Sequence, residues 1–149
     1  MKTATLGRRE LLVWQSFALP DILVVVKRRL CRMNKLSELA NRGVNLEEAM
    51  DRFMNNEQMY VKYIMQLPKD NTYTVLVQSL NEQNIQEAFE AAHRLKGITA
   101  NLAMWKINEK LKLVVDNLKK GIMPEETQWL AFDTEYQEMM TFIQQENNL

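Results

Sequence analysis

The only histidine of this 149-residue chain, His93, is the residue best suited to chemistry. If the surrounding stretch is helical, His93, Lys96, Gly97 and Ala100 share one side of the helix, because they lie three, four and seven residues apart. A neutral imidazole can attack an activated phosphorus, and a lysine one turn away can stabilise the oxygens of the transferred group. A glycine inside a helix costs about 1 kcal/mol relative to alanine, so Gly97 indicates that something must approach closely there.

Other kinds of chemistry lack the residues that they require. With one cysteine, Cys31, and one histidine, the chain can form neither an internal disulfide nor the usual zinc clusters, and a reducing compartment fits this composition. The sequence also contains no glycine-rich phosphate loop, nucleotide motif or Ser-His-Asp set. We therefore expect no autonomous kinase or other enzyme activity: the chain can pass a phosphoryl group along but cannot take one from ATP. The alternative is that His93 is merely structural or solvated.

The composition predicts an all-α fold. Only four glycines and three prolines occur, and residues with high helix propensity are abundant. Apolar residues recur with helical period over 46–53, 57–67, 85–102 and 104–120, and Pro124 opens a final helix. Residues 71–80 contain several β-branched and aromatic residues, yet we interpret them as helical because no neighbouring strand could pair with them. Short turns between these segments predict an up-and-down four-helix bundle with one or two extra short N-terminal helices.

Residues 1–32 differ in character from residues 33–149, which we expect to form the bundle. The first segment carries seven Lys/Arg and two Asp/Glu, a net charge of +5, and the remainder twelve and seventeen, a net charge of −5. The acidic body argues against nucleic acid as a partner. The apolar run from Leu11 to Val26 is interrupted by Pro20 and Asp21, and it lacks both the length of a membrane span and a signal-peptide cleavage site.

We interpret residues 1–32 as a dispensable extension outside the bundle, since a different kind of sequence begins at Met33. A short helix is expected over residues 35–41, where Gly43 can end it. The alternative for the extension is a basic amphipathic segment that binds a membrane surface through residues 11–32.

Several short runs resemble known sequences. The run Ala92-His93-Arg94-Leu95-Lys96-Gly97, followed by Asn101-Leu102, resembles the signature of histidine-containing phosphotransfer domains of two-component phosphorelays. The runs Gly43–Ala49 and Phe53–Glu57 resemble stand-alone bacterial members of that family. The similarity covers roughly residues 35–145, and the first 32 residues lie outside it.

This resemblance implies a four-helix bundle with an exposed histidine that is phosphorylated on Nε2. It identifies His93 as the phosphorylated residue, Lys96 as the supporting lysine, and Gly97 as the clearance residue, whose missing side chain leaves room for the partner. A polar residue on a neighbouring helix is expected to orient Nδ1 of the imidazole. The chain departs from the family at Ala100 and Ala103, where glycine is common. Each added methyl group is expected to narrow the space in which a partner docks.

The resemblance also implies the partners: response-regulator receiver domains, a sensor histidine kinase, or both. No cofactor is expected in this chain, since magnesium would belong to the receiver's aspartate site. We expect a cytoplasmic monomer without membrane or nucleic-acid contact, with Ala100 and Phe89 beside His93 as docking residues, although Phe89 suits the core equally well. The alternative function is a helical adaptor that binds a partner through the same face without phosphorylation.

Overall fold

The structure of the chain, a computed structural model, describes residues 19–147, with side chains described from residue 22 onwards. All regular secondary structure in this range is helical, which confirms the predicted all-α fold class. Residues 1–18, the larger part of the expected extension, lie outside the described residues. The chain divides between Ser37 and Glu38 into two units, and each is described here by itself.

The first unit contains most of helix α2, which runs from Leu19 to Asn41. The short helix predicted over residues 35–41 is thus the last part of a longer helix that continues through Met33. Its apolar side chains are largely exposed, and Ile22, Leu23 and Leu30 each expose more than half of their surface. None of the described helices combines the length and the hydropathy needed to cross a membrane.

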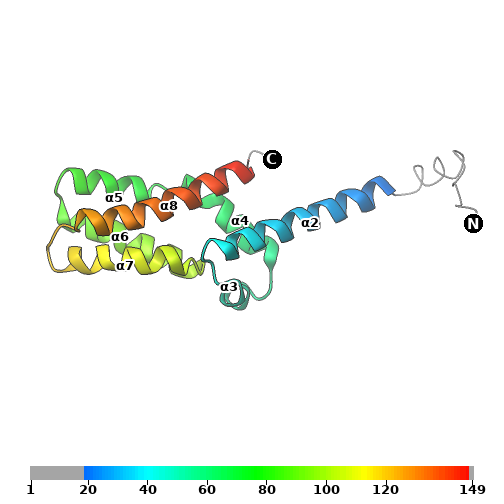
Figure 1. The fold of residues 1–149 in the computed structure, drawn as a ribbon, viewed down its shortest axis with the longest axis horizontal. Coiled ribbons are helices and arrows are strands. Elements are labelled where there is room, and N and C mark those ends of the chain that lie inside the picture. Colours follow the sequence, from blue (N-terminus) through cyan, green and yellow to red (C-terminus); the bar gives the residue numbers. More distant parts are fainter. Residues whose placement is uncertain (1–18, 148–149) are drawn as a thin grey trace, which may run out of the picture. The chain divides into compact units, whose positions relative to one another are not determined.

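The second unit is a helical bundle preceded by two short helices, as the sequence predicts. Its elements are α3 (Leu46–Arg52), α4 (Glu57–Gln66), the 3-10 turn η1 (Leu67–Lys69), α5 (Thr72–Asn81), α6 (Ile85–Asn101), α7 (Trp105–Lys119) and α8 (Glu126–Asn147). Each of the helices α5 to α8 packs against the next, and they lie alongside one another in Figure 1. Helix α4 packs against α8.

Asparagine side chains begin three of these helices. Asn45, Asn56 and Asn84 each accept a hydrogen bond from the backbone N–H three residues later, at 3.0–3.2 Å. These bonds satisfy N–H groups that have no partner within the helix, so each asparagine both stops the preceding turn and starts a new helix. The β-branched segment is helical, as interpreted: it forms α5, in which Leu76 is fully buried.

The core between α6 and α7 combines small and large side chains. Helix α6 contributes Ala88, Ala92 and Leu95, all fully buried, and α7 contributes Leu111 and Val114, also fully buried. The alanines allow the two helices to approach closely. Because these residues turn one side of α6 inward, the side that carries His93 faces out.

Helix α6 ends in a left-handed residue that is normally glycine. Ala103 has φ 55° and is fully buried, and the N–H of Met104 donates to the carbonyl of Thr99 across the end of the helix at 2.9 Å. This is the Schellman pattern of helix termination. Two long-range bonds hold this turn: Asn45 donates its N–H to the carbonyl of Ala103 at 2.9 Å, and the buried hydroxyl of Tyr60 donates to the carbonyl of Leu102 at 2.8 Å.

Candidate functional site

Helix α6 brings the residues singled out in the sequence onto one outward side. His93 and Gly97 are exposed, and Lys96 and Ala100 are partly exposed. We call these four residues the His93 strip. The helix is continuous from Ile85 to Asn101, so the strip is a single ridge two turns long rather than residues gathered from separate elements.

The imidazole of His93 is accessible at the surface and has one aromatic neighbour. The ring of Phe89, one turn earlier, lies 5.7 Å from it between centroids, tilted by 30°. Phe89 is partly buried, so it borders the core and the strip at once. No residue in the described part of the chain hydrogen-bonds the imidazole, and the polar residue expected to orient Nδ1 is not found there.

The space above Gly97 is open. A Cβ atom built on Gly97 meets no atom within 4 Å, so no neighbour within the described chain requires glycine at this position. The backbone does not require it either, because Gly97 lies within regular α-helix and is not among the residues with positive φ. A residue that weakens the helix is therefore kept at an exposed site beside His93 without any internal packing reason.

The two alanines that depart from the family pattern lie in different environments. Ala100 is partly exposed in the His93 strip, and its methyl group can limit what approaches. Ala103 is fully buried at the end of α6, so its methyl group lies inside the protein. The expectation that both alanines narrow a docking surface therefore does not hold for Ala103, whose consequence is backbone strain at a position with φ 55°.

A buried amide lies beneath the strip. Asn108 of α7 donates through Nδ2 to the carbonyl of Lys96 at 2.9 Å and to the hydroxyl oxygen of Thr99 at 3.0 Å. The Thr99 hydroxyl also donates to the Lys96 carbonyl, at 3.1 Å. Asn108 is only 6% exposed and Thr99 is fully buried. The backbone carbonyl of Lys96 and the side chain of Thr99, which lie on either side of Gly97, are thus bonded to α7 from below.

A charged network fixes α3 against the end of the strip. Arg52 donates to the carbonyl of Ala100 at 2.7 Å and pairs with Glu48 at 2.5 Å, and the indole N–H of Trp105 donates to the same glutamate at 2.6 Å. Arg52 is exposed, and Glu48 and Trp105 are partly buried, so this network links α3 to the end of α6 and the start of α7 at the edge of the core.

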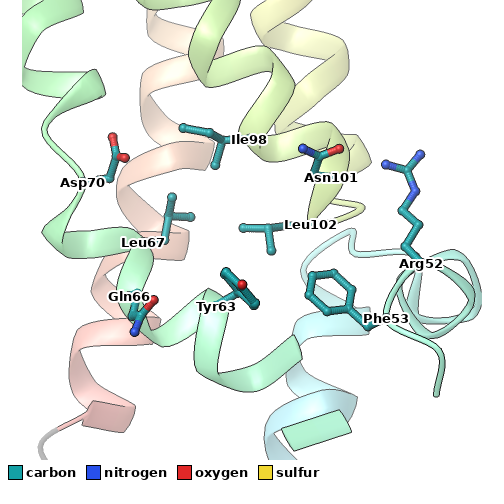
Figure 2. A pocket seen from close by; sticks show the side chains of 9 residues that line it. All are labelled: Arg52, Phe53, Tyr63, Gln66, Leu67, Asp70, Ile98, Asn101 and Leu102. Atoms are coloured by element: carbon teal, nitrogen blue, oxygen red, sulfur yellow. The ribbon is translucent and has the colours of Figure 1, made fainter. Parts of the chain in front are cut away.

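A groove of about 610 Å³ adjoins the strip on the side of α4. Phe53 and Tyr63 line it from the α3–α4 side, and Ile98 and Leu102 from α6 and its end. Figure 2 shows Arg52 and Asp70 at opposite ends of this mainly apolar groove. The tip of the α3–α4 turn lies beside it: Met54 is 90% exposed with φ 52°. Surface of this kind suits an apolar anchor of a binding partner.

No group of three or more potential metal ligands occurs within residues 19–147.

Sequence reasoning found the His93 strip but missed Asn108, Thr99 and Arg52. A signal for Asn108 was present, because it occupies an inward position of α7 between Met104 and Leu111, where the helical period calls for an apolar residue. No comparable signal marks Arg52, whose contact with Ala100 spans 48 residues of sequence.

Comparison of the chain with protein-family models, with curated proteins and with solved structures gave no match.

Proposed function

We propose that the protein is a phosphocarrier of a two-component phosphorelay, which accepts a phosphoryl group on His93 and passes it to or from the aspartate of a receiver domain. The observation that carries the proposal is the open surface at Gly97 beside an exposed histidine. A glycine that nothing inside the described chain requires is explained if a second protein must come close to His93. The resemblance of residues 92–97 to the phosphotransfer signature supports the same function.

The proposed reaction is a displacement at phosphorus. Neutral His93 attacks through the lone pair of Nε2, a P–N bond forms, and the P–O bond to the receiver's aspartate breaks. The electron pair of that bond leaves with the aspartate carboxylate, and Nδ1 keeps its proton. In the reverse direction the aspartate attacks and the imidazole leaves. Direct contact between the two proteins aligns donor and acceptor, which replaces an encounter in solution.

Lys96 supplies positive charge to this reaction. It lies one turn from His93 on the same side of α6, and its ammonium group has no ion-pair partner among the described residues. It can therefore approach the equatorial oxygens of the phosphoryl group, where negative charge concentrates during transfer. Magnesium at the receiver's aspartate would belong to the partner. A receiver-coupled carrier of this kind would work in the cytoplasm as a monomer.

The test is transfer from radiolabelled, phosphorylated receiver domains of the host. Wild type is expected to gain acid-labile, alkali-stable label, and His93→Gln is expected to gain none. Arg94→Gln is the matched control, because Arg94 is the next residue along and is also exposed, but lies on the side of α6 that faces α5. It should retain transfer. Equal labelling of wild type and His93→Gln would contradict the proposal.

The second candidate is a helical adaptor that binds a partner without phosphorylation. The groove of Figure 2, in which Tyr63 is 48% exposed, favours this candidate as a binding surface in its own right. The two functions differ in their need for the imidazole. A partner that binds His93→Ala as tightly as wild type, and receives no phosphate from wild type, would identify the protein as an adaptor.

A further inference from the structure

Asn108 is buried in a core that is otherwise almost entirely apolar. Four buried polar residues are found in the described part of the chain, and two of them, Thr99 and Asn108, meet beneath the His93 strip. One Nδ2 group donates both of its hydrogens, to the Lys96 carbonyl and to the Thr99 hydroxyl oxygen. An apolar residue of similar size would fill the same space, so core packing alone does not explain an amide here.

The hydrogen bonds of Asn108 meet α6 beside Gly97, the residue with the lowest helix propensity in that helix. Gly97 has no side chain to restrain its backbone, and it lies between Lys96 and Thr99, the two residues that Asn108 contacts. The Thr99 hydroxyl adds a second bond to the Lys96 carbonyl, so that one peptide group is held from two side chains. The glycine that leaves room for a partner thus follows directly after a peptide group that two buried side chains hold.

We propose that Asn108 is a positioning residue for phosphoryl transfer. It holds the Lys96 carbonyl and the Thr99 hydroxyl against α7, so that Lys96 keeps its place relative to His93 when a partner presses on the open surface at Gly97. Asn108 itself touches neither the phosphoryl group nor the partner. The inference rests on the proposed phosphocarrier function and goes beyond it by assigning a role to a residue outside the signature.

The first test is replacement of the amide by an apolar group of similar size, Asn108→Leu. Val114→Ala, a truncation of a fully buried residue on the same helix, controls for a general loss of stability. Amide hydrogen exchange is measured across α6 and α7. In Asn108→Leu we expect the amides of residues 97–100 to exchange about tenfold faster than in wild type, and faster than the rest of α6. In Val114→Ala the amides of residues 97–100 should not exchange faster than those of the rest of α6.

The second test separates positioning from docking. Transfer from a phosphorylated receiver domain is measured as a function of receiver concentration. Asn108→Leu is expected to lower the maximal rate by about tenfold and to leave the half-saturating concentration within about twofold, because Lys96 is misplaced while the docking surface is intact. Thr99→Val removes one acceptor of the Asn108 amide and should lower the maximal rate by a smaller factor. Thr99→Ser keeps the hydroxyl and should transfer at the wild-type rate.

The outcomes are distinguishable. A wild-type protein that never acquires phosphate contradicts the phosphocarrier function. A wild type that transfers normally, together with an Asn108→Leu variant that matches Val114→Ala in exchange and in maximal rate, contradicts the role of Asn108. If Asn108→Leu does not fold, the pair Thr99→Val and Thr99→Ser decides: equal maximal rates for both would overturn the inference.

Discussion

Replacement of Gly97 by alanine should change stability and function in opposite directions. The added methyl group meets no atom within 4 Å, so it introduces no clash within the protein. Gly97 lies in the interior of α6, where alanine is favoured over glycine by about 1 kcal/mol. We therefore expect Gly97→Ala to raise the free energy of unfolding by about 0.5–1 kcal/mol, and the midpoint of thermal unfolding by about 1–4 °C.

The same methyl group should slow phosphoryl transfer, because it occupies the space into which the partner must come. We expect the rate at subsaturating receiver to fall by at least about fivefold, since small displacements of reacting groups are costly. Denaturant unfolding and transfer from a phosphorylated receiver domain measure the two effects on one preparation.

Gly121 provides a matched control. A Cβ atom there also meets nothing within 4 Å, but the residue has φ 75°, which disfavours every side chain. Gly121→Ala should therefore lower the free energy of unfolding by about 1 kcal/mol and leave transfer unchanged. A Gly97→Ala variant that is more stable yet transfers at the wild-type rate would refute the clearance role of Gly97. One that is less stable would refute the conformational argument.

Three further predictions concern the fold that supports the strip. Ala103→Val should be much less stable than Ala103→Gly in denaturant unfolding, because a β-branched side chain is strained at φ 55° and the site is fully buried; equal stabilities would contradict this. Tyr60→Phe should lose about 1 kcal/mol of stability by the same measurement, since it removes a buried hydrogen bond to a backbone carbonyl at the end of α6, and an unchanged midpoint would contradict this. Burial raises the pKa of Glu135, but the hydrogen bonds and charges of Lys110 and Lys106 outweigh it and hold this pKa below the ordinary 4.5. Glu135 therefore stabilises the fold above pH 4.5 and loses that effect as the pH falls through its lowered pKa. The difference in free energy of unfolding between wild type and Glu135→Gln should shrink in acid, and a difference that does not depend on pH would contradict the assignment.

The helices were largely predictable because their signals are local. Asn45 and Asn56 each stand one residue before a run with helical period, and a capping side chain bonds its own neighbourhood. The grouping of His93, Lys96 and Gly97 followed from the same periodicity, since one continuous helix carries all three. Such features need no knowledge of how distant segments pack.

The remaining features depend on tertiary contacts that no local pattern specifies. Arg52 reaches the carbonyl of Ala100 only because α3 packs beside the end of α6, and Asn108 reaches Lys96 only because α7 folds back along α6. The residue expected to orient Nδ1 of His93 was inferred from a resemblance rather than from a contact, and the described chain supplies none. The length of α2 was underestimated because Met33 marks a change of composition without any helix-breaking residue.

The most direct test of the central claim is to locate the phosphoryl group by NMR. The protein, labelled with ¹⁵N in its only imidazole, is incubated with a phosphorylated receiver domain and examined for coupling between phosphorus and nitrogen. The phosphocarrier account predicts one phosphoryl group on Nε2 of His93, which is discharged when unphosphorylated receiver is added. Phosphate on another residue, phosphate that no receiver can remove, or none at all would contradict it.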